Sequence, residues 1–223
     1  MSQPTVRGGR RERAKQDKRA RIFSAASSLF AEHGFERVTT QQIADRADVG
    51  AGTLFRYAAT KGELYLMVYN ERFAAAVESG AVAAQALTDV TEALFAQVAP
   101  VLAWARSLGD SADYQRELLF GPPGERYRDE GLALVADLEE RMTSLLVAGS
   151  TPDEAVLREA RRAARSTFAV LNLLLVQPLN DLHPDSNPSA ELRAHIAQIV
   201  SGYEVSIRTD SSGVGAAPPA GSD

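Results

Sequence analysis

Apolar residues recur at helical spacing over most of the chain. From Lys61 onward, long stretches rich in Ala, Leu, Glu and Arg are separated by clusters of Gly and Pro. This pattern is typical of helices and their ends rather than of strands. We therefore predict an all-α fold. The helices expected beyond residue 60 span 61–79, 83–107 with a bend at Pro100, 111–119, 124–148, 152–177 and 189–208.

The first apolar stripe lies near the N-terminus, and a second, shorter one follows it. One face of a helix is formed by Ile22, Ala25, Ala26, Leu29 and Phe30. A histidine followed by a glycine, at residues 33–34, should end this helix. After it, a threonine at 39 and a glutamine at 42 form a capping box, so a helix is expected to begin at residue 40. The apolar side of this second helix is formed by Ile43, Ala44 and Ala47.

A tight turn separates the second helix from a third. Asp48 tolerates a left-handed backbone, Val49 can plug the core, and Gly50 offers an unhindered helix start. In the third helix Leu54 points inward, and residues 53, 56 and 57 remain for the outside. Thr60 then caps a helix that opens with a lysine. Two short helices joined by such a turn predict a helix-turn-helix that reads DNA.

This segment resembles the N-terminal domain of TetR-type transcriptional regulators. The shared signature is a capping Thr, an Ile-Ala pair, a Val in the turn, Gly-Thr-Leu before an aromatic residue, a second aromatic residue and a Lys that opens the fourth helix. In this chain these residues are Thr39, Ile43-Ala44, Val49, Gly52-Thr53-Leu54-Phe55, Tyr57 and Lys61. The likeness covers roughly residues 20 to 65 and includes Phe30 and Gly34-Phe35. The chain departs from the usual pattern at Asp48 (Gly), Gly50 (Ser), Phe55 (Tyr) and Ala58-Ala59 (Phe-Pro).

Residues of the helix-turn-helix divide into base readers and backbone contacts. Gln41, Thr53 and Arg56 suit base edges in the major groove: the amide suits adenine, the Thr methyl suits thymine, and the guanidinium suits guanine. Because Gly52 has no side chain, the backbone of the third helix could approach the DNA closely. The full set expected at DNA is Thr39, Thr40, Gln41, Gly52, Thr53, Phe55, Arg56, Tyr57 and Lys61, of which 39, 40, 57 and 61 are placed for phosphates.

Charge is distributed unevenly along the chain. Residues 1–64 hold 12 Lys/Arg against 7 Asp/Glu, whereas the net charge of the whole chain is −5. The basic end therefore carries the signal for nucleic acid. We expect a disordered basic tail over 1–17, whose arginines could track phosphates, a helix-turn-helix domain over 18–64, a helical ligand-binding and dimerisation domain over 65–208, and a disordered tail over 209–223.

The last two long helices carry more apolar surface than one small domain hides. One has Leu157, Ala160, Ala164, Phe168, Leu171 and Leu175 at steps of three, four and seven, with Val170, Leu173 and Leu174 on a second face; the other has Leu192, Ile196, Ile199, Tyr203 and Ile207. Two such helices from each of two subunits would make a four-helix bundle, as the resemblance implies, although packing within one chain stays open. A dimer then predicts a near-palindromic operator.

The resemblance also implies a small-molecule effector that shifts the spacing of the two readers and releases the DNA. Aromatic side chains and one amide on an apolar helix are the candidates for an apolar or aromatic ligand: Trp104, Tyr114, Phe120, Tyr127, Phe168 and Asn172. Ordinary core packing is the alternative for each of them.

Composition limits the remaining classes. The chain has no Cys, no apolar run of about 18 residues and no apolar core of a signal peptide at its basic N-terminus, so we expect a cytoplasmic protein without thiolate zinc. We expect no cofactor and no enzyme activity, because the sequence lacks a Ser nucleophile elbow, a phosphate-binding Gly loop and HExxH. The polar run 180–185 could hold a metal, but a solvated loop explains it.

Two alternatives to a sequence-specific regulator stay open. A helical enzyme is the weaker one. A sequence-indifferent DNA-packaging protein is compatible with the Arg-rich tail but does not explain a capped helix pair with exposed Thr53 and Arg56. Repression needs only occupancy of a promoter and is the simpler mode of regulation.

Overall fold

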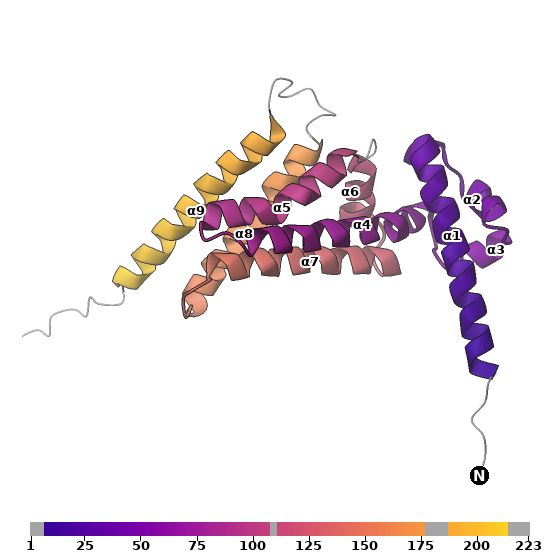
Figure 1. Cartoon of the computed structure of the whole chain (residues 1–223), viewed down its shortest axis with the longest axis horizontal. Helices are drawn as coiled ribbons and strands as arrows, with labels where there is room; N and C mark the ends of the chain where they lie inside the picture. Colours follow the sequence, from indigo (N-terminus) through magenta and orange to yellow (C-terminus); the bar gives the residue numbers. More distant parts are fainter. Residues whose placement is uncertain (1–6, 108–110, 177–186, 214–223) are drawn as a thin grey trace, which may run out of the picture. The chain divides into compact units, whose positions relative to one another are not determined.

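The computed structural model describes residues 7–107, 111–176 and 187–213, and all its regular elements are α-helices (Figure 1). The all-α prediction is therefore confirmed. The helices are α1 (Arg7–Arg37), α2 (Thr40–Arg46), α3 (Ala51–Leu54), α4 (Lys61–Ala84), α5 (Val90–Ser107), α6 (Ser111–Phe120), α7 (Arg126–Leu146), α8 (Glu154–Val176) and α9 (Pro188–Gly213).

The chain divides into two compact units. Unit 1 comprises residues 1–75 and 106–134, and unit 2 comprises residues 76–105 and 135–223. The helix-turn-helix therefore shares unit 1 with the first half of α4, with α6 and with the start of α7. Helices α4 and α7 each contribute residues to both units.

Helix α1 begins earlier than the sequence analysis expects. Residues 7–17 are helical, so the prediction of a disordered tail over 1–17 is wrong for this part, and residues 1–6 lie outside the described residues. After the glycine pair at residues 8–9, Arg, Lys, Gln and Ala are good helix formers, and the segment contains no proline that would interrupt α1. At its other end α1 kinks at Gly34, where a φ of 75° suits glycine, and continues to Arg37 instead of ending at residues 33–34 as predicted.

The helix-turn-helix has the predicted caps. The Thr39 hydroxyl accepts a hydrogen bond from the Gln42 N–H at 3.2 Å, and the Gln42 side chain accepts from the Thr39 N–H at 2.8 Å, which completes the capping box. Ile43 and Leu54 are fully buried. Between the helices Asp48 adopts a φ of 51°, the left-handed conformation predicted for the turn.

Replacing Asp48 by glycine is expected to raise the free energy of unfolding by up to about 1 kcal/mol, because glycine adopts a positive φ without strain. The ion pair that Asp48 makes with Arg21 at 3.0 Å is largely exposed and contributes little. Urea denaturation measures the change. The matched control is Asp45→Gly, which places glycine inside α2 and should instead lower stability by about 0.5 to 1 kcal/mol. Equal destabilisation by both variants would contradict this account of the turn.

Aromatic side chains form the centre of unit 1. The ring of Tyr65 in α4 packs edge-on against Phe30 and Phe35, with ring centroids 5.0 and 4.8 Å apart. Lys61, the first residue of α4, lies over the Phe35 ring at 4.2 Å. Helix α1 is thus joined to α4 by a buried aromatic cluster.

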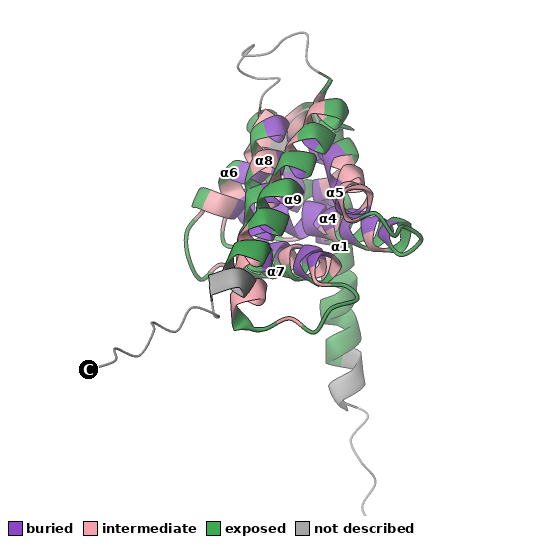
Figure 2. Ribbon diagram, turned by 90° about the vertical axis from the view of Figure 1, so that its left-hand side faces the viewer, coloured by how far each residue is buried: buried purple, intermediate pink, exposed green. Residues whose placement is uncertain are grey.

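In unit 2 the long helices pack together as a bundle, and α8 packs against α9 (Figure 2). Helix α4 runs to Ala84 and α5 begins at Val90, so the expected boundaries at 79 and 83 are too early. The reason is Gly80, which lies inside α4 directly against the backbone of Gln97 in α5 and permits a close helix crossing. Asp89 caps α5 by accepting the Glu92 N–H at 2.9 Å.

The last helix is longer than predicted. Helix α9 continues to Gly213, so residues 209–213 are helical rather than disordered, and residues 214–223 lie outside the described residues.

None of the helices in the described ranges is long and apolar enough to cross a membrane.

Candidate DNA interface

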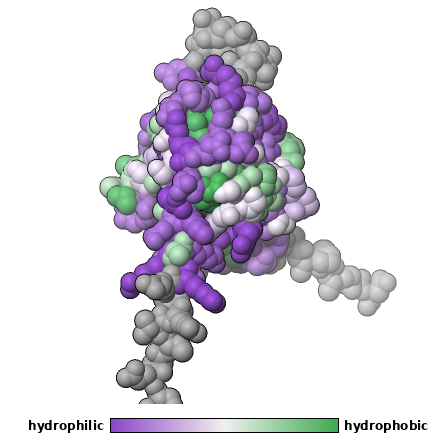
Figure 3. Space-filling model, turned by 90° about the vertical axis from the view of Figure 1, so that its right-hand side faces the viewer, coloured by the Kyte–Doolittle hydropathy of each residue, from purple (hydrophilic) through white to green (hydrophobic). Residues whose placement is uncertain are grey.

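The residues predicted to contact DNA gather on unit 1 and keep access to solvent. Thr39, Gln41, Gly52, Phe55 and Arg56 are exposed, and the other four (Thr40, Thr53, Tyr57 and Lys61) are partly exposed. Phe55 leaves 49% of its surface exposed, which is unusual for a large apolar side chain next to a well-packed helix. In the view of Figure 3 the surface is mainly hydrophilic, with smaller hydrophobic areas.

Several of these side chains already have partners within the protein. The Gln41 amide donates to the Asp45 carboxylate at 2.7 Å, so a contact with adenine requires that bond to open. The Lys61 ammonium donates to the carbonyl oxygens of Phe35 at 3.0 Å and Glu36 at 3.4 Å. Lys61 therefore also caps the end of α1, a structural role that the sequence did not indicate.

Arg56 differs from these residues because it is exposed and pairs with none of the described acidic side chains. It lies beside a hollow of about 590 Å³, which we call the basic groove. The groove is lined by residues of α1, of α3 and the turn after it, and of the start of α7: Arg11, Ala14, Lys15, Lys18, Thr53, Arg56, Tyr57 and Arg126.

The sequence indicated only half of the residues that line the basic groove. Arg11 belongs to the predicted tail, but Lys15, Lys18 and Arg126 were not among the expected contacts. Arg126 lies far from the helix-turn-helix in the sequence, and the fold alone brings it to this site. One local signal exists, since an arginine at the first residue of a helix opposes the helix dipole.

The start of α7 is attached to α4 by a buried carboxylate. Glu63 is 3% exposed, and one of its oxygens accepts the backbone N–H groups of Tyr127 at 2.9 Å and Arg128 at 3.1 Å. Burial raises the pKa of Glu63, the two N–H donors oppose that shift, and the nearby Glu125 carboxylate adds to it. Glu63 thus supplies the helix cap that positions Arg126.

The predicted ligand residues divide equally between the two units. In unit 1 the Tyr114 hydroxyl donates to Asn70 at 2.9 Å, and Asn70 donates to the Tyr127 carbonyl at 2.7 Å. Burial raises the pKa of Tyr114, as expected for a phenol in a core. Phe120 is 82% exposed at the end of α6, and this placement does not support a role in lining a cavity.

In unit 2 the three remaining candidates, Trp104, Phe168 and Asn172, are each partly buried. The Asn172 amide donates to the Phe168 carbonyl at 2.8 Å within α8. This bond uses one donor of the amide and leaves its oxygen available, so Asn172 stays a candidate for orienting a ligand.

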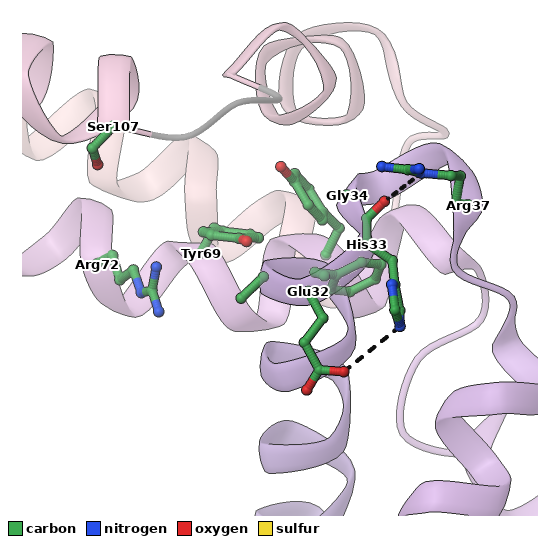
Figure 4. A pocket seen from close by; sticks show the side chains of 10 residues that line it. Glu32, His33, Gly34, Arg37, Tyr69, Arg72 and Ser107 are labelled. Atoms are coloured by element: carbon green, nitrogen blue, oxygen red, sulfur yellow. Dashed lines mark hydrogen bonds and ion pairs between the residues drawn. The ribbon is translucent and has the colours of Figure 1, made fainter.

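A second hollow of unit 1, of about 350 Å³, lies at the kinked end of α1 (Figure 4). His33 faces Glu32 at 3.6 Å, and the Arg37 guanidinium donates to the His33 carbonyl at 3.0 Å. These contacts identify His33 as a helix-end residue. Within the described ranges no group of three or more acidic or His side chains could hold a metal, and the polar run 180–185 lies outside those ranges.

Comparison with known proteins places residues 22–68 in the family described as bacterial regulatory proteins, tetR family. Residues 22–68 thus carry the N-terminal domain of TetR-family regulatory proteins. The match covers α2, α3 and the helices on either side of them. It confirms the recognition made from the sequence signature.

Characterised relatives are similar over the same part of the chain. The HTH-type transcriptional repressor KstR of Mycobacterium tuberculosis is 37% identical over 60 residues, which is 27% of this chain and 27% of KstR. KstR of Rhodococcus jostii is also 37% identical over 60 residues, or 28% of its length. The chain thus matches little more than a quarter of the length of these relatives.

Solved structures of TetR-family regulators share the fold over most of the chain. A TetR transcriptional regulator from Rhodococcus sp. RHA1 superposes with a TM-score of 0.60 at 18% identity, covering 83% of this chain and 97% of that one. The regulator FadR from Bacillus subtilis, solved in complex with stearoyl-CoA, gives a TM-score of 0.56 at 17% identity, covering 82% and 98%. At these identities the likeness concerns the fold alone.

Proposed function

We propose that the protein is a transcriptional repressor that binds a near-palindromic operator as a homodimer and releases it when a small apolar or aromatic ligand binds. The observation that carries the proposal is the solvent-accessible α3, with Thr53 and Arg56 presented beside the basic groove on a capped helix-turn-helix. A recognition helix presented in this way suits the major groove.

The proposed dimer rests on α8 and α9. One face of each helix is buried within the chain, as at Leu171 and Ile196, whereas Leu173 and Val205 remain 58% and 55% exposed. Exposed apolar residues on adjacent long helices favour a four-helix contact between two copies. A dimer would place two α3 helices about one turn of DNA apart, about 34 to 36 Å.

The proposed ligand class rests on side chains of unit 2. Trp104 and Phe168 are partly buried aromatic residues there, and Asn172 is a polar group beside the buried leucines of α8. A regulator of the same fold was solved with stearoyl-CoA, which carries a long apolar chain. To release the operator, the ligand must bind more tightly to the dimer conformation in which the spacing of the two α3 helices does not match the DNA. The difference in binding free energy must be on the order of 1 to 3 kcal/mol.

A sequence-indifferent DNA-packaging protein is the second candidate, favoured by the five cations of the basic groove. Such a protein would bind random and selected DNA alike, because phosphate contacts carry no sequence information. The competition of random DNA against a selected operator distinguishes the two functions.

Arg56→Ala tests base reading directly. Loss of a bidentate contact with guanine costs about 1 to 3 kcal/mol and should relax the preference at one position of each half-site. Affinity for a panel of single-base operator variants is the measurement. The matched control is Arg46→Ala, an arginine of α2 that pairs with Glu32 at 2.9 Å and should keep the base preference. An Arg56→Ala protein that ranks all operator variants as the parent does would remove its base-reading role.

A further inference from the structure

We propose that the basic groove binds the phosphate backbone of DNA, outside the base pairs that α3 reads, and that Arg126 at the start of α7 supplies one of the phosphate contacts. The proposal rests on the proposed function, because it extends the DNA interface of the same unit. It brings in a residue that lies outside the helix-turn-helix and outside the part of the chain that the family description matches.

The first wall of the groove is a stripe of α1. Its lining residues Arg11, Ala14, Lys15 and Lys18 follow the spacing of a single helix face. The acidic residues of the same segment, Glu12 and Asp17, do not line the groove. One face of this helix thus presents three cations to the groove, an arrangement that suits a row of phosphates.

The second wall is formed by α3 and the turn after it. The Tyr57 hydroxyl donates to the Lys15 carbonyl at 3.2 Å and so joins this wall to α1. Arg56 and Thr53, the proposed base readers, border this wall, so the phosphate contacts fall to the cations of α1 and to Arg126. The groove therefore adjoins the residues proposed to read bases, as a backbone-binding surface must.

Arg126 closes the groove from a third segment. A cation at the first residue of a helix is disfavoured by the positive end of the helix dipole, so helix stability does not explain its position. Its side chain is 66% exposed and pairs with Glu130 at 2.8 Å. The next two residues are fixed by the buried Glu63, which positions the backbone of Arg126 at the groove.

Five cations and no carboxylate line this groove, and among the five only Arg126 has an ion pair with a described residue, Glu130, so the groove of the free protein carries a net positive charge. A polyanion with regularly spaced charges compensates it best, and DNA is the polyanion that the neighbouring α3 already binds under the proposed function. An acidic protein surface is the competing occupant.

The test is the salt dependence of DNA binding by the full-length protein. Affinities of wild type and Arg126→Ala are measured between 50 and 200 mM salt on the selected operator and on a random duplex of equal length. Loss of one phosphate contact should reduce the slope of log K against log salt by about 0.9 on both duplexes, so wild type loses about 3.5-fold more affinity than the variant over this range. Base preference should not change.

Two further variants separate a direct contact from general charge or folding effects. Arg106→Ala removes an exposed arginine of the same unit outside the groove and should keep the wild-type slope. Glu130→Gln releases Arg126 from its ion pair and should tighten binding to both duplexes. The unfolding midpoints of all three variants should match wild type, because the altered groups are exposed.

Each outcome decides between the claims. A wild-type protein that prefers its operator, together with an Arg126→Ala slope equal to wild type, overturns the role of Arg126 and leaves the proposed function intact. If the slope falls equally in Arg106→Ala, the effect is due to net charge, and the proposed role of Arg126 is overturned. An acidic peptide that binds the groove more tightly than the duplexes do would also overturn that role. If wild type binds neither duplex, the proposed function and this inference both fail.

Discussion

Replacing Gly52 by glutamate is expected to weaken operator binding by at least about 100-fold while the protein stays folded. Gly52 lies in α3, is exposed, and a Cβ atom built there meets nothing within 4 Å. The fold itself therefore tolerates a side chain at this position. DNA in the proposed complex does not, because the carboxylate would be brought against phosphates and bases at close range.

Gly52→Ala refines the same prediction. Alanine favours the helix over glycine by about 0.5 to 1 kcal/mol, so this variant should be at least as stable as wild type and yet bind the operator less tightly. Ala83→Glu is the matched control, since it adds the same charge at an exposed position of α4 that belongs to unit 2. Fluorescence anisotropy with labelled operator measures the affinities, and thermal unfolding reports the fold. A Gly52→Glu protein that binds as wild type does would show that α3 does not face DNA.

Replacing Glu63 by alanine is expected to lower the free energy of unfolding by about 2 kcal/mol or more. The backbone N–H groups of Tyr127 and Arg128 would lose their shared acceptor, and each buried donor left without a partner costs about 1 to 3 kcal/mol. Urea denaturation at fixed protein concentration measures the loss, because a dimer makes stability depend on concentration. Glu130→Gln, an exposed carboxylate of the same helix, should change stability by less than about 0.5 kcal/mol.

Glu63→Gln separates the hydrogen bonds from the charge. The amide oxygen can still accept both N–H groups, so this variant should be at least as stable as wild type at pH 7. Burial raises the pKa of Glu63 in the folded protein, so the folded state keeps its proton to higher pH than the unfolded state does. Wild-type stability should therefore fall as the pH rises from the ordinary glutamate value through the raised pKa.

The comparison of the two proteins across pH is the decisive measurement for Glu63. The stability advantage of Glu63→Gln should be smallest below pH 4.5 and should grow to a plateau above the raised pKa. The same pH dependence in both proteins would show that Glu63 does not titrate in this way. A stable Glu63→Ala protein would show that α7 needs no cap from α4.

The sequence predicted the helix-turn-helix closely because its signals are local. The capping box at Thr39 and the left-handed Asp48 each depend on neighbours within a few residues, and the structure has both. Helix boundaries were predicted less well where a tertiary contact overrides a local signal. Gly80 is such a case: it lies inside α4 because α5 approaches it closely.

The candidate site could be predicted only in part. The reader residues lie next to one another in the sequence, and their spacing on a short helix indicates which of them face outward. The basic groove also needs Arg126, about seventy residues later in the chain, and Lys15 from a segment expected to be disordered. No periodicity connects these segments, so only the fold of unit 1 brings them together.

Aromatic residues were poor guides to a ligand site for a related reason. Tyr114 and Tyr127 belong to the core of unit 1, where both join a hydrogen-bond network through Asn70, whereas Phe120 is exposed. The sequence contains the same residue type in each case. Burial depends on which helix faces meet, and that information is not local.

Selection of binding sites from a random DNA pool by the purified protein tests the central claim most directly. The proposed dimeric reader predicts an enriched near-palindrome whose half-site centres lie about 10 base pairs, one turn of DNA, apart, and Arg56→Ala should lose the preference at one position of each half-site. Recovery of a pool without enrichment at moderate salt, from a protein that still binds DNA, would contradict sequence-specific reading and favour the packaging function.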